Sequence, residues 1–233
     1  MSRPIRVYYS GLIYHVLNRG NNRQIIFAED SNYRHYLNIL KRYKEKFSFK
    51  IFAYCLMTNH VHLLLQVSEK GSISKIMQAI TIAHTRYYHY KYQCSGHIWQ
   101  GRFKSPIVSN DEYLLTTMRY IEQNPVRARI APDPKGYPWS SLLANTQLKS
   151  DNFVDREQNP VYNGLGDNSE ERRLAYKQFV LSLLEDEKAQ EVRDSLIGKY
   201  HYISEKFQKE INERLIRKRS RGRPKRQKEL TLN

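Results

Sequence analysis

The sequence predicts an α+β fold, in which an antiparallel sheet carries helices on one face and a helical, basic extension follows. Short apolar runs typical of strands alternate with stretches of helical periodicity in the first half of the chain. A two-residue polar turn joins two of these runs, which favours antiparallel pairing. With 233 residues, of which 40% are hydrophobic and 12% aromatic, the chain is long enough to bury a substantial core.

The first predicted elements are one strand and one helix. Residues 12–18 form a short apolar run rich in strand formers, and the polar residues 19–22 predict a loop after it. A helix is expected to begin near residues 29–31, because acidic and hydroxyl side chains are typical of a helix start. Apolar side chains then recur at helical spacing as far as Phe47.

The next predicted elements complete the sheet. Residues 49–57 and 60–67 predict two strands that pair antiparallel, because only Thr58-Asn59 separates them. Apolar residues at helical spacing predict a second helix over 72–93, and the glycine-bounded run 97–108 predicts a fourth strand. The order strand, helix, strand, strand, helix, strand is compatible with a ferredoxin-like or RRM-like sandwich.

A third helix and a C-terminal extension follow the sheet. The helix is expected to begin at residues 109–112 and to end close to Asn124, because Pro125 follows. Further on the composition becomes polar, and amphipathic patterns predict two more helices at 170–184 and 187–200. The predicted domain, helical extension and basic, disordered tail occupy residues 1–145, 146–212 and 213–233.

Net charge is the strongest global signal. The chain carries 39 Lys and Arg against 23 Asp and Glu, a formal charge of +16, which points to a polyanionic partner such as nucleic acid. The charge is uneven along the chain. Residues 1–145 carry 20 basic and 8 acidic side chains, residues 146–200 carry 8 and 11, and residues 201–233 carry 11 and 4.

Other features of the composition exclude several classes of protein. Cys55 and Cys94 form neither a paired-cysteine zinc pattern nor a disulfide framework. The N-terminus lacks the apolar core of a signal peptide, and no apolar run is long enough to span a bilayer. We therefore expect a cytoplasmic, nucleoid-associated protein with no membrane contact.

Residues His60-Val61-His62 lie in a predicted strand. Because side chains alternate along a strand, the two imidazoles project from the same face while Val61 turns toward the core. Two imidazoles on one face can converge on one metal ion; the alternative is a pair of ordinary histidines in contact with solvent. The sequence gives His15 and His97 no defined place near this pair.

Tyr120 and Asn124 lie four residues apart in the predicted third helix. This spacing puts a phenol and a carboxamide on the same helical face, one turn apart. The structural alternative is a buried tyrosine, with Asn124 as a C-terminal helix residue before Pro125. The combination of this pair with the two histidines favours a functional site.

Three segments stand out in chain order: MTNHVHLLL at 57–65, GHIWQGRFKS at 96–105 and MRYIEQNPVRA at 118–128. They resemble the motifs of the HUH single-tyrosine transposases, and most closely those of the REP-associated tyrosine transposases. Three motifs in the same order are more specific than any one of them. The resemblance extends from residue 13 to about residue 143 and does not cover the rest of the chain.

The resemblance implies an enzyme that cuts and rejoins single-stranded DNA. His60 and His62 would bind Mg²⁺ or Mn²⁺, Asn124 would supply a third ligand, and Tyr120 would attack a phosphate of the DNA. Gln123 is the alternative amide ligand if the helix is rotated. A 5′-phosphotyrosine ester retains the energy of the phosphodiester, so a free 3′-hydroxyl can rejoin the strands without ATP. The implied substrate is a hairpin-forming, repetitive palindromic element.

The predicted DNA contacts combine aromatic and cationic side chains, which stack on unpaired bases and pair with phosphates. From the second motif and from charge alone, the candidates are Arg19, Trp99, Arg102, Phe103, Lys104, Arg127 and Arg129. The alternative places Trp99 and Phe103 in the core, on one face of the fourth strand, and leaves the arginines as ordinary solvated residues.

The C-terminal tail is strongly basic, with nine Lys or Arg and no acid in residues 214–228. Within it, RGRPK at 221–225 resembles an AT-hook core, in which Arg221 and Arg223 would enter the minor groove of A·T-rich duplex DNA. The alternative is a disordered tail that binds any nucleic acid.

Three functions remain open on this sequence. The leading one is a transposase: a metal-dependent endonuclease and strand transferase for single-stranded DNA, acting as a monomer or homodimer with Tyr120 as nucleophile. The second is a catalytically silent regulator that binds hairpin or A·T-rich DNA. The third, a metal-dependent phosphodiesterase that uses water, would need the metal site but not Tyr120.

Overall fold

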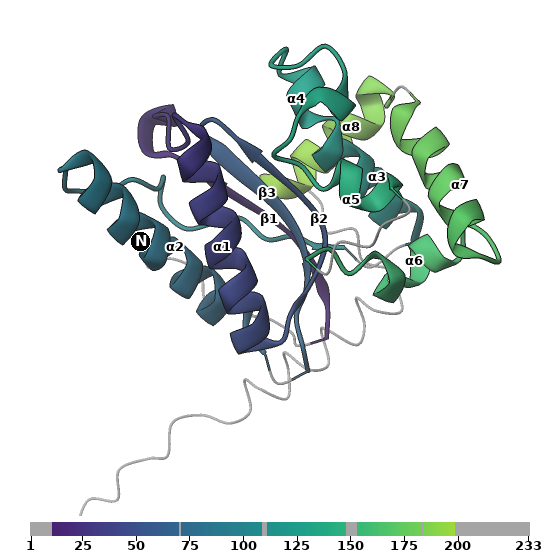
Figure 1. The fold of residues 1–233 in the computed structure, drawn as a ribbon, viewed down its shortest axis with the longest axis horizontal. Helices are drawn as coiled ribbons and strands as arrows, with labels where there is room; N and C mark the ends of the chain where they lie inside the picture. The colour runs from purple at the N-terminus through teal and green to yellow at the C-terminus, as the bar shows by residue number, and fades with distance from the viewer. Residues whose placement is uncertain (1–10, 70, 109–110, 148–152, 183, 199–233) are drawn as a thin grey trace, which may run out of the picture. The chain divides into compact units, whose positions relative to one another are not determined.

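A computed structural model shows the fold (Figure 1) and describes residues 11–69, 71–108, 111–147, 153–182 and 184–198. The basic tail predicted at 213–233, with Arg221 and Arg223, lies outside the described residues. The predictions for that tail therefore stay predictions.

A four-stranded antiparallel sheet forms the centre of the described chain. Its strands are β1 (Ile13–Arg19), β2 (Lys50–Met57), β3 (His60–Gln66) and β4 (Ile107–Val108), in the order β2-β3-β1-β4. β2 and β3 pair as a hairpin across Thr58-Asn59, with Met57 opposite His60. Strand order and connections are those of a ferredoxin-like sandwich, so the predicted α+β fold class is confirmed.

Two long helices cover one face of this sheet, as Figure 1 shows. α1 (Asp30–Phe47) begins after Glu29, whose backbone N–H donates to the side chain of Asn32 at 3.2 Å. α2 (Ile73–Tyr92) begins after Ser72, whose side chain accepts a hydrogen bond from the first turn. The buried residues of both helices recur three and four positions apart, so each helix turns an apolar stripe inward.

The predicted fourth strand is wrong over most of its length. Residues 97–106 follow β1 through isolated bridges at Trp99 and Lys104 and through scattered backbone hydrogen bonds, and regular pairing is confined to Ile107–Val108. Gly101 has a φ of +63°, a left-handed conformation that interrupts an extended backbone. The apolar pattern of this run therefore reflects an irregular segment beside β1.

The third predicted helix is confirmed, with a break near its end. α3 (Asp111–Glu122) is followed by a single turn, α4 (Asn124–Arg127), and Gln123 between them keeps a helical backbone with φ −86° and ψ −3°. The break between α3 and α4 lies next to Pro125, where the sequence predicts the end of the third helix, because proline cannot donate a backbone hydrogen bond.

The extension forms helices close to the predicted ones. The helices after α4 are α5 (Leu142–Thr146), α6 (Pro160–Asn163), α7 (Ser169–Leu181) and α8 (Asp186–Leu196). The 3₁₀ turns are η1 (Asn21–Arg23), η2 (Pro134–Gly136) and η3 (Arg156–Gln158). None of the helices in the described ranges is long and apolar enough to cross a membrane.

One core joins α3 to the sheet and to the extension. Leu64 of β3 belongs to the same buried cluster as Met118 of α3, Tyr176 of α7 and Val192 of α8. α3 and these helices lie on the face of the sheet opposite α1 and α2 (Figure 1). Described residues on both sides of position 146 therefore contribute to one core.

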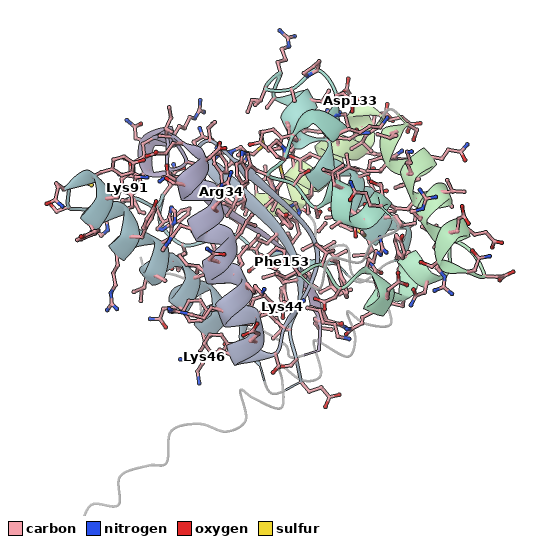
Figure 2. The ribbon with its side chains drawn as sticks, in the orientation of Figure 1. Arg34, Lys44, Lys46, Lys91, Asp133 and Phe153 are labelled. Atoms are coloured by element: carbon pink, nitrogen blue, oxygen red, sulfur yellow. The ribbon has the colours of Figure 1, made fainter. Side chains whose placement is uncertain are left out.

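A polar contact also links the extension to the helix layer. Lys44 of α1 donates to the backbone carbonyl of Phe153 at 2.9 Å and pairs with Asp155 at 2.8 Å (Figure 2). The same carboxylate accepts a hydrogen bond from the backbone N–H of Ile51 at 2.8 Å. Residues 153–155 are thereby fixed at the edge strand β2.

Candidate active site

The strands β1 and β3 place three histidines on one face of the sheet. His60 and His62 alternate with a buried valine, and the next residue on their face, Leu64, belongs to the core cluster of α3. β1 runs antiparallel beside β3, with Leu17 opposite His62. His15 lies on the same face, and its Nε2 is 2.9 Å from Nδ1 of His62. The histidine site therefore faces α3, away from α1 and α2.

The turn from α3 to α4 brings Tyr120 and Asn124 over these histidines. Because the backbone stays helical through Gln123, the two side chains lie on one helical face. The ring centroid of Tyr120 is 5.7 Å from that of His62 and 6.2 Å from that of His15. Both Tyr120 and Asn124 are buried. The nucleophile and the ligands named from sequence are thus brought together.

A pocket of about 380 Å³ opens at this point. Its lining residues are Leu17, Arg19, His60, His62, Lys104, Tyr120, Asn124, Arg127, Ala128, Arg193, Leu196 and Ile197. Four of them are Lys or Arg and none is acidic, although the exposed Asp186 pairs with Arg127 at 2.9 Å. The lining therefore favours an anionic ligand such as phosphate. Arg193, in the extension, was not singled out from sequence.

Burial keeps the three histidines on this face of the sheet uncharged. Burial, together with the charge of Arg19, lowers the pKa of His60 to about 4, although a hydrogen bond with Asn124 opposes the shift. Burial also holds the pKa of His62 well below its ordinary value, with smaller contributions from His60 and His15. The pKa of His15 is lowered to about 3 by its complete burial. Neutral imidazoles keep a lone pair, which metal binding requires.

Nδ1 of both strand histidines is engaged by another side chain, so Nε2 is the nitrogen that each ring can offer, and at His60 it is the one left for the hydrogen bond with Asn124. Nδ1 of His60 lies 2.7 Å from Oδ1 of Asn59, which can only accept, so this nitrogen donates and Nε2 keeps the lone pair. Nδ1 of His62 is engaged by His15. With the amide oxygen of Asn124, the two Nε2 atoms fit a divalent ion that takes further ligands from phosphate and water. Within the described residues, no group of three or more histidine, cysteine or carboxylate side chains is arranged to hold a metal ion, so the amide of Asn124 would have to complete the site.

The alternative ligand Gln123 points elsewhere. Its Nε2 donates to the backbone carbonyls of Val180 and Ser182, at 2.7 Å each, where α7 ends. Arg119, one turn earlier, donates to the hydroxyl of Ser182 at 3.0 Å. Gln123 therefore ties α3 to α7, and Asn124 is the amide that lines the pocket.

A buried carboxyl group fixes the same turn from behind. Glu122 accepts hydrogen bonds from Ser141 at 2.6 Å, from Asn145 at 2.7 Å and from the hydroxyl of Tyr176 at 2.8 Å. Burial raises the pKa of Glu122 to about 7, although these hydrogen bonds oppose the rise. Sequence reasoning missed this residue. The available signal was an acid four positions after Met118, on the buried side of an amphipathic helix.

The cations named from sequence as DNA contacts divide into two groups. Arg19, Lys104 and Arg127 line the pocket. Arg102 and Arg129 are exposed but lie outside its lining. The three cations of the lining can therefore contact a phosphate in the pocket. Arg102 and Arg129 can contact DNA only outside the pocket.

The aromatic candidates lie outside the pocket lining. Trp99 is half-buried, and its ring centroid is 5.7 Å from that of His84 and 6.5 Å from that of Tyr36, so it packs toward the helix layer. Phe103 is also half-buried. For Trp99 the packing alternative describes the structure, and base stacking by either ring stays a prediction.

Known proteins resemble this chain, and two of them are informative. It is 31% identical over 109 residues to a REP-associated tyrosine transposase of Haemophilus influenzae. The match covers 42% of this chain and 61% of the relative, so the chain spans about three-fifths of the length of that curated protein. A solved structure of a REP-associated tyrosine transposase bound to a REP hairpin matches with a TM-score of 0.55, at 18% identity, over 66% of this chain and 98% of the other. This second likeness concerns the fold.

A family model adds the remaining comparison. The model described as "Transposase IS200 like" matches residues 8–124, half of the chain. The matched range contains His60, His62, Tyr120 and Asn124. The resemblance carried by the three sequence motifs is thereby confirmed, and the chain belongs to the IS200-like transposase family.

Proposed function

We propose that this protein is a metal-dependent enzyme that nicks and rejoins single-stranded DNA beside a hairpin. Tyr120 is the nucleophile in this proposal, and His60, His62 and Asn124 hold Mg²⁺ or Mn²⁺. The Lys and Arg side chains that line the pocket bind the phosphate backbone.

One observation carries the proposal: a tyrosine, an asparagine and two neutral imidazoles from distant parts of the chain converge in one pocket lined by cations. Nδ1 of each histidine is engaged by another side chain, which makes Nε2 the nitrogen that each ring can offer to a metal ion. The lining cations would attract the phosphate that Tyr120 must attack. Packing alone would not require this combination of groups.

The chemistry follows from these groups. Oη of Tyr120 loses its proton and bonds to phosphorus, while the bond from phosphorus to O3′ breaks and O3′ takes up a proton. The products are a 5′-phosphotyrosine ester and a free 3′-hydroxyl. Because one phosphate ester replaces another, the reverse attack rejoins strands without ATP. A bound divalent ion would withdraw charge from the phosphate. Arg19 and Lys104 line the pocket where they can neutralise the same phosphate.

The relatives indicate the substrate class. The solved relative is bound to a REP hairpin, and the curated relative is named for the same association. We extend this to a hairpin-forming, repetitive palindromic DNA for the present chain. In this proposal Tyr120 acts with the histidines of its own chain, in a monomer or a homodimer. Arg221 and Arg223 of the tail would add salt-dependent binding to A·T-rich duplex.

The deciding experiment incubates the full chain with a labelled hairpin oligonucleotide that carries single-stranded flanks, in Mn²⁺ or Mg²⁺. We expect a protein–DNA adduct that resists denaturation, requires the metal ion and disappears in Tyr120→Phe, while hairpin binding persists. Tyr90→Phe is the matched control, because Tyr90 is 81% exposed and lies outside the pocket lining.

Other outcomes would select the alternatives. Cleavage that persists in Tyr120→Phe would identify water as the nucleophile and the protein as a phosphodiesterase. Hairpin binding by the wild-type chain without any cleavage would favour the catalytically silent regulator. His60→Ala and His62→Ala are expected to lose cleavage and keep binding, which separates chemistry from recognition.

A further inference from the structure

His15 is completely buried and makes its hydrogen bond to a residue of the pocket without lining the pocket itself. Its side chain is 0% exposed, and its Nε2 lies 2.9 Å from Nδ1 of His62, with the ring centroids 5.1 Å apart. Nδ1 of His15 has no hydrogen-bond partner among the described residues. The bond to His62 is therefore the polar interaction that this ring makes in the described part of the chain.

The register of the sheet produces this contact. His15 is paired with Leu64 across β1 and β3, and Leu17 is paired with His62. His15 is therefore the diagonal neighbour of His62 on the same face, a position within reach of a ring side chain. Because backbone pairing fixes both strands, the imidazoles meet in one defined orientation.

This hydrogen bond constrains the protons on both rings. A neutral imidazole has one N–H, so one nitrogen donates and the other accepts. For His62 to offer the lone pair of Nε2, its proton must sit on Nδ1 and point toward His15. Nε2 of His15 then accepts, and the proton of His15 sits on its own Nδ1.

We infer that His15 is a positioning residue that holds His62 in the tautomer and orientation that metal binding requires. The inference rests on the proposed function, because it takes His62 as a metal ligand. Ligating histidines generally bond through their second nitrogen to a carboxylate, a carbonyl or water, which fixes the ring and the tautomer. Here an imidazole on the neighbouring strand has that position.

The test measures Mn²⁺ affinity of the full chain by calorimetry, without DNA, in wild type, His15→Leu, His15→Gln and His62→Ala. Leucine removes the acceptor, whereas the amide oxygen of glutamine reaches about as far as Nε2 and can accept from His62. We expect His15→Leu to bind Mn²⁺ roughly 10- to 100-fold more weakly, and His15→Gln to recover most of the loss. Hairpin binding without metal should be unchanged in both His15 variants.

The outcomes distinguish this inference from the proposed function. If His62→Ala binds Mn²⁺ as wild type does, the proposed metal site is wrong and the inference falls with it. If His62→Ala is weak but His15→Leu is not, only the inference is wrong. A His15→Gln protein as weak as His15→Leu also overturns it, because a packing role alone would give that result.

A second measurement needs no variant. Nitrogen NMR of ¹⁵N-histidine-labelled wild type, saturated with Mg²⁺, reports which ring nitrogen of each histidine carries the proton. We expect the proton of His62 on Nδ1 and that of His15 also on Nδ1. A proton on Nε2 of either ring would overturn the inference, even if the leucine variant did not fold.

Discussion

Burial of a histidine side chain lowers its pKa and so changes how the stability of the folded protein depends on pH. His84 of α2 lies outside the pocket lining, and its ring centroid is 5.2 Å from that of Phe27 and 5.1 Å from that of Tyr36. Burial lowers the pKa of His84 to about 3 from an ordinary value of 6.5. The folded state therefore keeps this ring neutral at a pH where the unfolded state binds a proton.

His84→Phe should flatten the acid side of the stability profile. Between the unfolded pKa of 6.5 and the folded pKa of about 3, the unfolded state binds the extra proton, so acid lowers the free energy of unfolding. In the middle of this window His84 contributes a slope of about 1.4 kcal/mol per pH unit, which the variant should lose. Urea unfolding of both proteins across this range measures the difference. An unchanged slope in a folded variant would contradict the role assigned to burial.

At the same scale, the sequence could place some site residues and not others. Strand alternation predicts that His60 and His62 share a face, and helical spacing predicts the same for Tyr120 and Asn124. His15 could not be placed, because its contact depends on the register between β1 and β3, a long-range pairing that no local pattern specifies.

Among the elements, α3 depends on the extension for its position. Glu122 receives hydrogen bonds from α5 and α7, and the turn that carries Tyr120 and Asn124 is thereby held against the sheet. Burial raises the pKa of Glu122 to about 7, so protonation of this carboxyl group costs much less than at an exposed position. An amide is therefore a reasonable substitute for this carboxyl group, and an aliphatic side chain is not.

We predict that Glu122→Leu lowers the free energy of unfolding by about 1–3 kcal/mol, because the buried hydroxyl of Tyr176 loses its acceptor. Glu122→Gln should lose less, since its amide oxygen can still accept. Chemical unfolding compares the two variants with Glu187→Leu, a control at an exposed position of α8 that should change stability by less than about 0.5 kcal/mol. Equal losses in Glu122→Leu and Glu122→Gln would argue against the hydrogen-bond network.

The elements that the sequence predicted are those whose pattern is local. β1, β2, β3, α1 and α2 follow from alternation, periodicity and a two-residue turn. The run 97–108 was misjudged because apolar content does not reveal the left-handed backbone at Gly101. The short helices α5 and α6 were not predicted, since at five and four residues they are stabilised by packing, as the burial of Leu142 and Tyr162 shows.

At the scale of the whole molecule, the net charge of a segment does not reveal which of its Lys and Arg side chains line the pocket. Residues 146–200 carry 11 acidic and 8 basic side chains, so this segment is acidic on balance. Yet Arg193 of that segment lines the same pocket as Arg19, Lys104 and Arg127. A cation of the extension is thus added to those of the sheet domain at the site proposed to bind DNA.

Arg193→Gln should therefore weaken binding of the hairpin with single-stranded flanks and reduce the salt dependence of that binding. Each phosphate neutralised by a protein cation releases condensed counterions, so losing one contact should lower the slope of log affinity against log salt by about 0.7 to 0.9. Because a phosphate contact carries no sequence information, the loss should be similar for different hairpins. Fluorescence anisotropy over a salt series measures both quantities.

Lys188→Gln is the control, since Lys188 is also in α8 but does not line the pocket. If both variants lose the same slope, the effect belongs to the net charge of the chain, and the extension has no part in the DNA site.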